Sequence, residues 1–255
     1  MTAGVTTGRV VPITDVAELA RACGNDALIV WAGQGLRAER SERAWRLGDA
    51  VAVVAPDLSR HDRIVVHGPI EQLVPLVYEV LGEVGTAYRP FGDEPVIREL
   101  ADRVEPLEVR AAFGWMDTTE PPSETAEGVR WLDGDTGVAE LLEQASPESY
   151  AWPGLSGIDR WAAATDQAGR LISVAADAWS APDLGFLAGV ATAPEARGRG
   201  LSRQVCAFVT AELLARHGRT GLMVDGRNAV AIRLYERLGY TYRPVAAANA
   251  EPPKG

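Results

Sequence analysis

The segment 184–218 constrains the fold more than any other part of the chain. It begins with an apolar run that ends at Thr192, continues through a glycine-rich loop around Gly198 and Gly200, and ends in a long amphipathic stretch. The apolar side chains of that stretch recur at the spacing of one helix face, at Leu201, Val205, Phe208, Val209, Leu213 and Leu214. A helix with one apolar face has to pack on another element, so the segment predicts a strand, a loop and a helix within an α/β fold.

The glycine-rich loop has the chemistry of an anion site. Glycines let the backbone approach a ligand closely, and the first N–H groups of a helix have no intrahelical acceptors. The helix dipole adds about half a positive charge at the same end. A diphosphate fits such a site, and the alternative interpretation is that Gly198 and Gly200 merely turn the chain.

A second helix is predicted after a strand at 222–224 and a turn at 225–227. Asn228 has the character of its N-cap, and Gly239 follows its end. Asn228 and Tyr235 are seven residues apart, which is two helical turns, so both face the same side. They either line one cleft or serve the fold, Asn228 as a cap and Tyr235 as a core residue.

Together the two motifs resemble those of the GNAT superfamily of N-acetyltransferases. The superfamily's acyl-CoA motif has an arginine or glutamine, a glycine three residues later and a small residue two further on, which matches Arg197, Gly200 and Ser202. Ser202 stands where the superfamily usually has glycine or alanine. The second motif matches Asn228, Ala231, Tyr235, Gly239 and Tyr240. The resemblance implies an α/β fold with a mixed sheet, GNAT-like and acyl-CoA-binding, in the C-terminal half.

The resemblance also assigns residues to acetyl-CoA. In such proteins the strand before the loop splays from its neighbour and pairs with the pantetheine arm, which maps onto residues 190–192. The N–H of Val190 then polarises the thioester carbonyl, and Tyr235 protonates the departing thiolate as the general acid. Main-chain N–H groups of residues 198–203 hold the diphosphate. The full set is Val190, Ala191, Thr192, Arg197, Gly198, Arg199, Gly200, Leu201, Ser202, Arg203, Asn228 and Tyr235.

The implied reaction is direct attack of an amine on acetyl-CoA, with no covalent enzyme intermediate and no metal. The acceptor is a small-molecule or peptide amine, and it needs a base because an ammonium group has no lone pair. Asp183, Glu195 or a chain of water molecules supplies that base. The alternative is a catalytically inactive acyl-CoA-binding or sensing module, which the presence of Tyr235 argues against. Three tryptophans before the loop either line an acceptor pocket or pack in the core, namely Trp152, Trp161 and Trp179.

Composition excludes several other classes of protein. The formal charge of -10 and the pI near 4.9 argue against nucleic acid or an anionic membrane as a partner. Lys254 is the only lysine, so neither a Walker-type phosphate loop nor a lysine-imine enzyme is expected. The 2 cysteines and 3 histidines have no metal-ligand spacing, so no metal is expected. We expect a cytoplasmic protein that is a monomer or a homodimer.

The order of predicted elements divides the chain into two domains. Residues 1–117 form a smaller α/β domain, interpreted as a degenerate GNAT-like domain without the cofactor loop. Residues 118–128 form a linker, 129–245 form the GNAT acetyltransferase domain, and 246–255 form a flexible tail. A similar order of strands and helices restarts after the linker, which suggests an internal duplication.

Individual elements are predicted from periodicity and turn residues. In the first half, two β-branched runs at 50–55 and 63–67 predict a hairpin, and 90–95 is expected to be a loop. In the second half, strands at 160–165 and 171–176 are expected to pair around a turn that contains Gly169.

Overall fold

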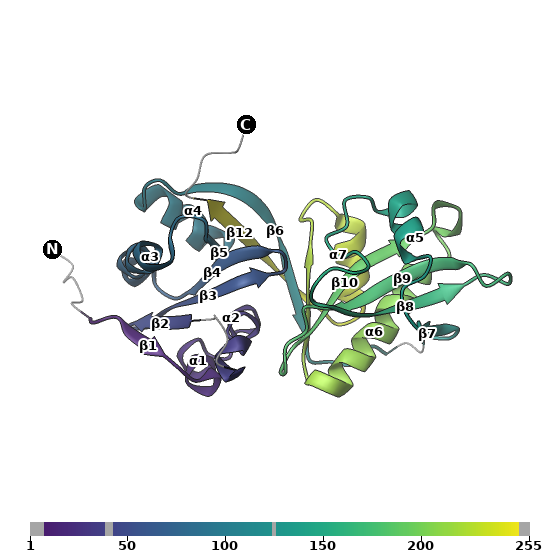
Figure 1. The fold of residues 1–255 in the computed structure, drawn as a ribbon, viewed down its shortest axis with the longest axis horizontal. Helices are drawn as coiled ribbons and strands as arrows, with labels where there is room; N and C mark the ends of the chain where they lie inside the picture. Colours follow the sequence, from purple (N-terminus) through teal and green to yellow (C-terminus); the bar gives the residue numbers. More distant parts are fainter. Residues whose placement is uncertain (1–7, 39–42, 124–125, 250–255) are drawn as a thin grey trace. The chain divides into compact units, whose positions relative to one another are not determined.

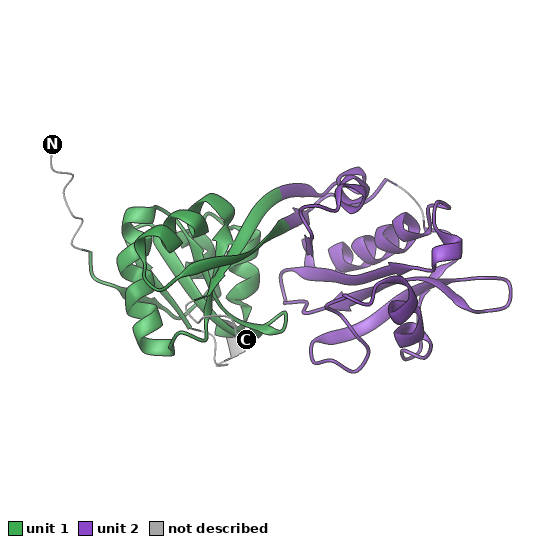
Figure 2. Cartoon of the chain, turned by 90° about the horizontal axis from the view of Figure 1, so that it is seen from above, with its two compact units in different colours: residues 1–114, 243–255 green, residues 115–242 purple. Residues whose placement is uncertain are grey.

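The computed structural model describes residues 8–38, 43–123 and 126–249. The chain divides into two compact units, residues 1–114 together with 243–255, and residues 115–242 (Figure 2). The first unit is therefore discontinuous in sequence, because the C-terminal strand returns to it.

The first unit contains a mixed sheet with helices. Its strand order is β1-β2-β3-β4-β5-β12, in which β4 and β5 are parallel and the other neighbouring strands are antiparallel. Its strands are β1 (Val11–Ile13), β2 (Arg43–Leu47), β3 (Ala50–Leu58), β4 (His61–His67), β5 (Arg89–Asp93) and most of β12 (Thr241–Asn249). Its helices are α1 (Val16–Ala22), α2 (Ala27–Ala32), the 3-10 helix η1 (Gln34–Ala38), α3 (Ile70–Val84) and α4 (Glu94–Arg103).

In the second unit the strand order is β6-β11-β10-β9-β8-β7, in which β10 and β11 are parallel. Its strands are the end of β6 (Glu108–Thr118), β7 (Val129–Trp131), β8 (Ile158–Thr165), β9 (Leu171–Ala178), β10 (Gly185–Thr192) and β11 (Thr220–Val224). Its helices are α5 (Val138–Ala145), the 3-10 helix η2 (Pro194–Ala196), α6 (Leu201–His217) and α7 (Ala229–Arg237). Figure 1 shows α6 on one face of this sheet and α5 and α7 on the other.

The two units repeat one order of elements. In each, three antiparallel strands lead to a helix, a parallel strand, a further helix and a final strand, as in β2-β3-β4-α3-β5-α4-β6 and β8-β9-β10-α6-β11-α7-β12. The final strands are exchanged, because β12 pairs with β5 of the first unit and β6 lies beside β11 of the second. The topology thus supports the duplication suggested by the sequence.

Local chemistry explains where the site-bearing elements begin and end. The β8–β9 hairpin turns at Asp166, whose Oδ1 accepts the N–H groups of Ala168 and Arg170, both at 2.9 Å. Gly169 in this turn has a φ of 81°. Helix α6 ends at Gly218, whose left-handed φ of 74° lets its N–H bond the Leu214 carbonyl.

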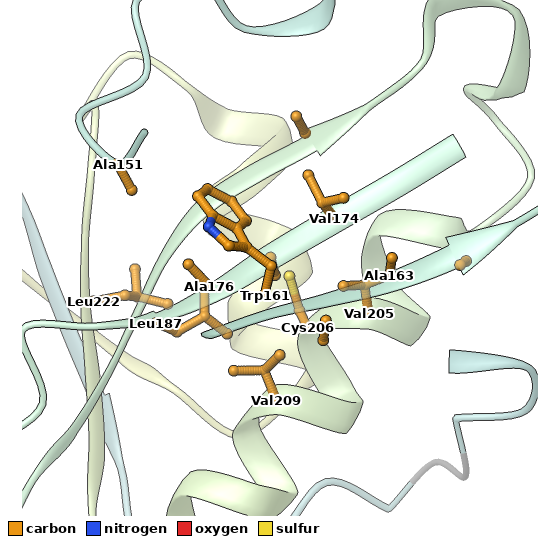
Figure 3. Close-up of a cluster of buried hydrophobic side chains, with 14 of the residues drawn as sticks. Ala151, Trp161, Ala163, Val174, Ala176, Leu187, Val205, Cys206, Val209 and Leu222 are labelled. Carbon is orange, nitrogen blue, oxygen red and sulfur yellow. The ribbon is translucent and has the colours of Figure 1, made fainter. Parts of the chain in front are cut away.

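The apolar core of the second unit lies on both faces of its sheet. Val205, Cys206 and Val209 of α6 point into this core, and Trp161 of β8 lies beside Ala176 of β9 (Figure 3). These alanine-rich strands bring the helices close to the sheet, because small side chains leave room for close packing.

Two expectations from the sequence are wrong. Residues 90–95 were expected to form a loop, but Arg89–Asp93 is strand β5, parallel to β4, and helix α4 begins at Glu94. The flexible tail was expected from residue 246, but residues 246–249 lie in β12, where Ala246 and Ala248 are fully buried. Residues 250–255 of that expected tail lie outside the described residues.

Candidate active site

A bulge in β10 marks the centre of the candidate site. Ala188 pairs with Ala176 of β9 and Ala191 with Val174, so β10 has one more residue than β9 between these pairs. Gly189 in the bulge has a φ of 63°, and a Cβ built on it would lie 2.6 Å from the Trp161 ring. Both the backbone conformation and the close tryptophan therefore require glycine here.

Strands β10 and β11 part just before this bulge. They pair as parallel strands only at Gly185 with Thr220 and at Phe186 with Gly221, within the described residues. β10 nevertheless continues to Thr192 and β11 to Val224. The main-chain groups of residues 187–192 on that side therefore do not pair with β11. A strand that accepts an extended ligand as an added partner needs such unpaired groups.

The corresponding strands of the first unit stay together. β4 and β5 pair from Arg63 with Arg89 to Val65 with Phe91, and a Cβ on Gly92 would lie 2.7 Å from the Val66 carbonyl oxygen. Two residues separate β4 from helix α3, whereas eight residues separate β10 from α6. The first unit therefore has neither the opening between strands nor the loop.

The loop between β10 and α6 leaves an open helix N-terminus. Gly198 and Gly200 have φ values of 75° and 78°, and a Cβ on either would meet no atom within 4 Å. Gly200 is the N-cap and supplies no side-chain acceptor to the first turn. The start of this 17-residue helix therefore has room beside the loop glycines and carries the positive end of the helix dipole, as an anion site requires.

Hydroxyl groups fix this helix N-terminus to the sheet. Thr192 Oγ1 shares hydrogen bonds with Ser202 Oγ at 2.7 Å and with Ser173 Oγ at 2.8 Å. Ser173 Oγ also donates to the Ala191 carbonyl at 3.1 Å. Ser202, which departs from the glycine or alanine usual in the motif, thus joins α6 to β10 through its hydroxyl.

The three arginines of the loop are not equivalent. Arg197 donates from Nη2 to the Ala145 carbonyl at 3.1 Å and from Nε to the Thr192 carbonyl at 3.4 Å, so it holds the loop against α5 and β10. Arg199 is exposed and Arg203 is half-buried. Leu201 is half-buried as well, at the first position of α6.

Asn228 performs the capping role that was one of its two interpretations. It is exposed, and its Oδ1 accepts the Ala231 N–H at 3.0 Å at the start of α7. Tyr235 lies two turns further along α7 and is 7% exposed. Its ring meets Tyr240 edge-on at a centroid distance of 5.9 Å.

Tyr235 belongs to the buried cluster of the second unit that also contains Cys206 of α6. Burial raises the pKa of Tyr235 well above its ordinary value of 10.0, and the nearby Cys206 and Tyr240 raise it further. The phenol is therefore protonated at neutral pH.

The other predicted candidates are less clearly assigned by the structure. Asp183 and Glu195 are exposed at the two ends of β10. Trp161 is 2% exposed and packs in the core against Gly189. Trp152 is half-buried and donates its indole N–H to the Ser149 carbonyl at 2.7 Å. No carboxylate is thereby singled out as the base.

Sequence reasoning missed Gly189. A glycine inside an apolar strand is the signal that could have pointed to a bulge. Among the described residues, no group of three or more histidine, cysteine or carboxylate side chains is placed to hold a metal ion. Within the same residues, no helix has the length and apolar character of a membrane span.

Comparison with known proteins gives one family match, over part of the chain. Residues 167–247, which include the bulge, the loop and both motif helices, match the model of a family described as FR47-like protein. No curated protein matches the sequence.

Several solved structures share the fold of nearly the whole chain. A GCN5-related N-acetyltransferase from Sphaerobacter thermophilus has 16% identity and a TM-score of 0.59, with 95% of this chain and 96% of that one covered. One from Kribbella flavida has 17% identity and a TM-score of 0.57, with coverages of 89% and 95%. A GNAT-family protein from Novosphingobium aromaticivorans has 22% identity and a TM-score of 0.54, with coverages of 87% and 96%.

The elements, the split sheet and these likenesses define an α/β protein with the GNAT fold. Its second unit carries the FR47-like segment, and the GNAT resemblance inferred from the two sequence motifs is confirmed.

Proposed function

We propose that the chain is an N-acetyltransferase that moves an acetyl group from acetyl-CoA to an amine. The observation that carries the proposal is the opening between β10 and β11 next to the open N-terminus of α6. The opening suits an extended pantetheine arm, and the helix N-terminus suits the diphosphate to which that arm is joined. The FR47-like match over the same residues supports this assignment.

Each part of acetyl-CoA then has its own partners in the chain. Main-chain N–H groups of residues 198–203 hold the diphosphate, and Arg199 and Arg203 add positive charge. The backbone of residues 190–192 pairs with the pantetheine arm. At the bulge, the N–H of Val190 polarises the thioester carbonyl, which makes its carbon more electrophilic.

The amine attacks the thioester carbon directly. Its excess proton leaves to a base or to water, and the C–S bond breaks to release a thiolate. Tyr235 gives its phenolic proton to that thiolate, and its raised pKa keeps this proton available at neutral pH. Asn228 caps α7 and so holds Tyr235 two turns away in place.

The acceptor proposed is a small-molecule or peptide amine. The formal charge of -10 on the chain attracts cations, so an amine that carries a further positive charge is favoured in encounter. Neither nucleic acid nor an anionic membrane is proposed as a partner, for the same reason.

Calorimetry with coenzyme A tests the binding part of the proposal. Ser202→Asp places a negative charge at the N-terminus of α6, and we expect it to weaken coenzyme A binding at least about tenfold. Ala211→Asp adds the same charge at an exposed position further along α6 and serves as the matched control. Equal affinities of the two variants, or no binding by the folded wild-type chain, would contradict the proposed site.

Turnover of acetyl-CoA with a panel of amines tests the reaction. We expect thiol release with at least one amine, and we expect Tyr235→Phe to lower kcat about a hundredfold. Tight acetyl-CoA binding without turnover on any amine contradicts the enzyme and favours the sensing module.

A further inference from the structure

Tyr235 lies close to the C-terminal end of its helix, where the last carbonyl groups have no donors within the helix. Helix α7 ends at Arg237, two residues after Tyr235. The Tyr235 carbonyl oxygen accepts the N–H of Leu238 at 2.9 Å and the N–H of Tyr240 at 3.1 Å. Gly239 turns the chain between these two donors with a φ of 91°. The main chain of Tyr240 is therefore bonded directly to the residue proposed as the proton donor.

Two buried threonines hold the Tyr240 side chain. Its hydroxyl oxygen lies 2.9 Å from Thr210 Oγ1 of α6 and 3.3 Å from Thr220 Oγ1 of β11. Tyr240 is 3% exposed, and both threonines have 0% exposure. A phenol has one proton, so the hydroxyl donates to one threonine and accepts from the other. Burial raises the pKa of Tyr240, so this proton stays in place at neutral pH. Tyr240 thereby joins α6 and β11 to the end of α7.

The rings of Tyr235 and Tyr240 are also in contact. Their centroids are 5.9 Å apart and their planes make an angle of 62°, which is an edge-to-face pair. Aromatic pairs are attractive in this geometry and weaker in a direct face-to-face stack. Tyr240 therefore constrains Tyr235 twice, through the carbonyl oxygen and through the ring.

We propose that Tyr240 is a positioning residue that holds the Tyr235 phenol in place for proton transfer to the departing sulfur of coenzyme A. The inference rests on the proposed function. It gives a role to the Tyr240 hydroxyl and to its partners Thr210 and Thr220, which neither sequence motif contains. Tyr240 acts through Tyr235 and exchanges no proton with coenzyme A.

Steady-state kinetics of Tyr240→Phe tests the proposal. This variant keeps the ring but removes both hydrogen bonds of the hydroxyl, and we expect kcat to fall about fivefold while KM for acetyl-CoA changes less than about twofold. Tyr242→Phe removes the hydroxyl of a half-buried tyrosine two residues further on and is the matched control, which should keep kcat within about twofold of the wild type. Equal losses of kcat from the two variants would overturn the proposal.

A double-mutant cycle separates positioning from packing. In a Tyr235→Phe background there is no phenolic proton left to position, so adding Tyr240→Phe should lower kcat less than about twofold. A packing role gives the same loss in both backgrounds, and that result would also overturn the proposal.

Nuclear magnetic resonance of the free protein separates this inference from the proposed function. In protein with ¹³C-labelled tyrosine rings, the Tyr235 signals are identified by their loss in Tyr235→Phe. We expect Tyr240→Phe to move these signals in the folded chain without ligand, and Tyr242→Phe to leave them in place. Unmoved signals in Tyr240→Phe refute the positioning role even where the wild type turns over normally. Moved signals without turnover on any amine uphold the contact but overturn the proposed function, and the catalytic part of this inference with it.

Discussion

Gly189 combines two constraints in one residue: its backbone is left-handed, and the Trp161 ring lies where a Cβ atom would stand. Its φ is 63°, and an added Cβ would lie 2.6 Å and 2.7 Å from two ring carbons of Trp161. We expect Gly189→Ala to destabilise the chain by about 2–4 kcal/mol, the sum of backbone strain and overpacking. Urea unfolding followed by tryptophan fluorescence measures the change.

Gly169 supplies the control for that prediction. Its φ is 81°, but a Cβ there would meet nothing within 4 Å. Gly169→Ala therefore carries only the backbone strain, about 1 kcal/mol. Equal losses from the two substitutions would show that the Trp161 contact has no energetic weight.

Residues of the candidate site differ in how well the sequence predicted them. Glycine loops and helical spacing are local patterns, so the sequence could place Gly198 and Gly200 in a loop before a helix and Tyr235 on the following helix. The structure has them in these elements. Gly189 was missed because it matters through its contact with Trp161, a residue distant in sequence, which no local pattern records.

At the level of elements, helix α2 depends on one carboxylate with two functions. Asp26 Oδ1 accepts the N–H groups of Leu28 and Ile29 at 3.0 Å and 3.2 Å, and its Oδ2 accepts from Arg243 at 2.5 Å. Burial alone would raise the pKa of Asp26, but Arg243 and the Ile29 N–H outweigh it and lower the pKa below 3.8.

The lowered pKa of Asp26 sets the sign of a pH dependence. The Asp26 carboxyl has a higher pKa in the unfolded chain than in the folded chain. The charged carboxylate therefore stabilises the fold fully above the unfolded-state pKa, and this stabilisation is lost as the pH falls through the folded-state pKa. Asp26→Asn keeps a cap but loses the charge, and we expect a cost of about 1–3 kcal/mol near pH 7 that shrinks below about pH 4. Chemical unfolding at several pH values checks this. A cost that stays constant down to pH 2 contradicts it.

The Asp15 cap of α1 is the comparison for Asp26. Asp15 Oδ1 accepts the Ala17 N–H at 2.7 Å at an exposed site. Because Asn caps helices as well as Asp does, Asp15→Asn should cost less than about 0.5 kcal/mol.

Elements with a strong periodic pattern were predicted well, and those without one were not. Helix α6 and the β8–β9 hairpin follow from an apolar stripe and a turn with Asp166 and Gly169. Strand β5 was missed because Pro90 and Gly92 are typical of loops. Proline has no N–H to donate to a neighbouring strand. Gly92 is required in this strand because a Cβ there would clash with the Val66 carbonyl oxygen. The end of β12 was missed because its short alanine run has no alternation.

At the level of the whole molecule, a strand at the C-terminal end belongs with the first unit, in line with the repeated order of elements. Each copy of the repeated order ends in a strand that completes the other copy's sheet. Sequence order alone assigns 129–245 to one domain, because nothing in β12 itself says which sheet it joins. Only the pairing of residues 245–247 with 91–93 reveals the exchange.

Because of this exchange, we expect a substitution at residue 248 to destabilise the first unit, although most of that unit lies at the other end of the sequence. Ala248 has 0% exposure and lies in the same core as Ile97 and Leu100 of α4. Ala248→Asp buries an unpaired carboxylate there, and we expect a loss of more than about 3 kcal/mol. Hydrogen exchange read by mass spectrometry should show faster exchange in β3, β4 and α3 of the first unit.

Thr241→Asp, at an exposed position of the same strand, should change stability by less than about 0.5 kcal/mol. Unchanged protection of β3 and β4 in Ala248→Asp would mean that β12 does not complete the first sheet.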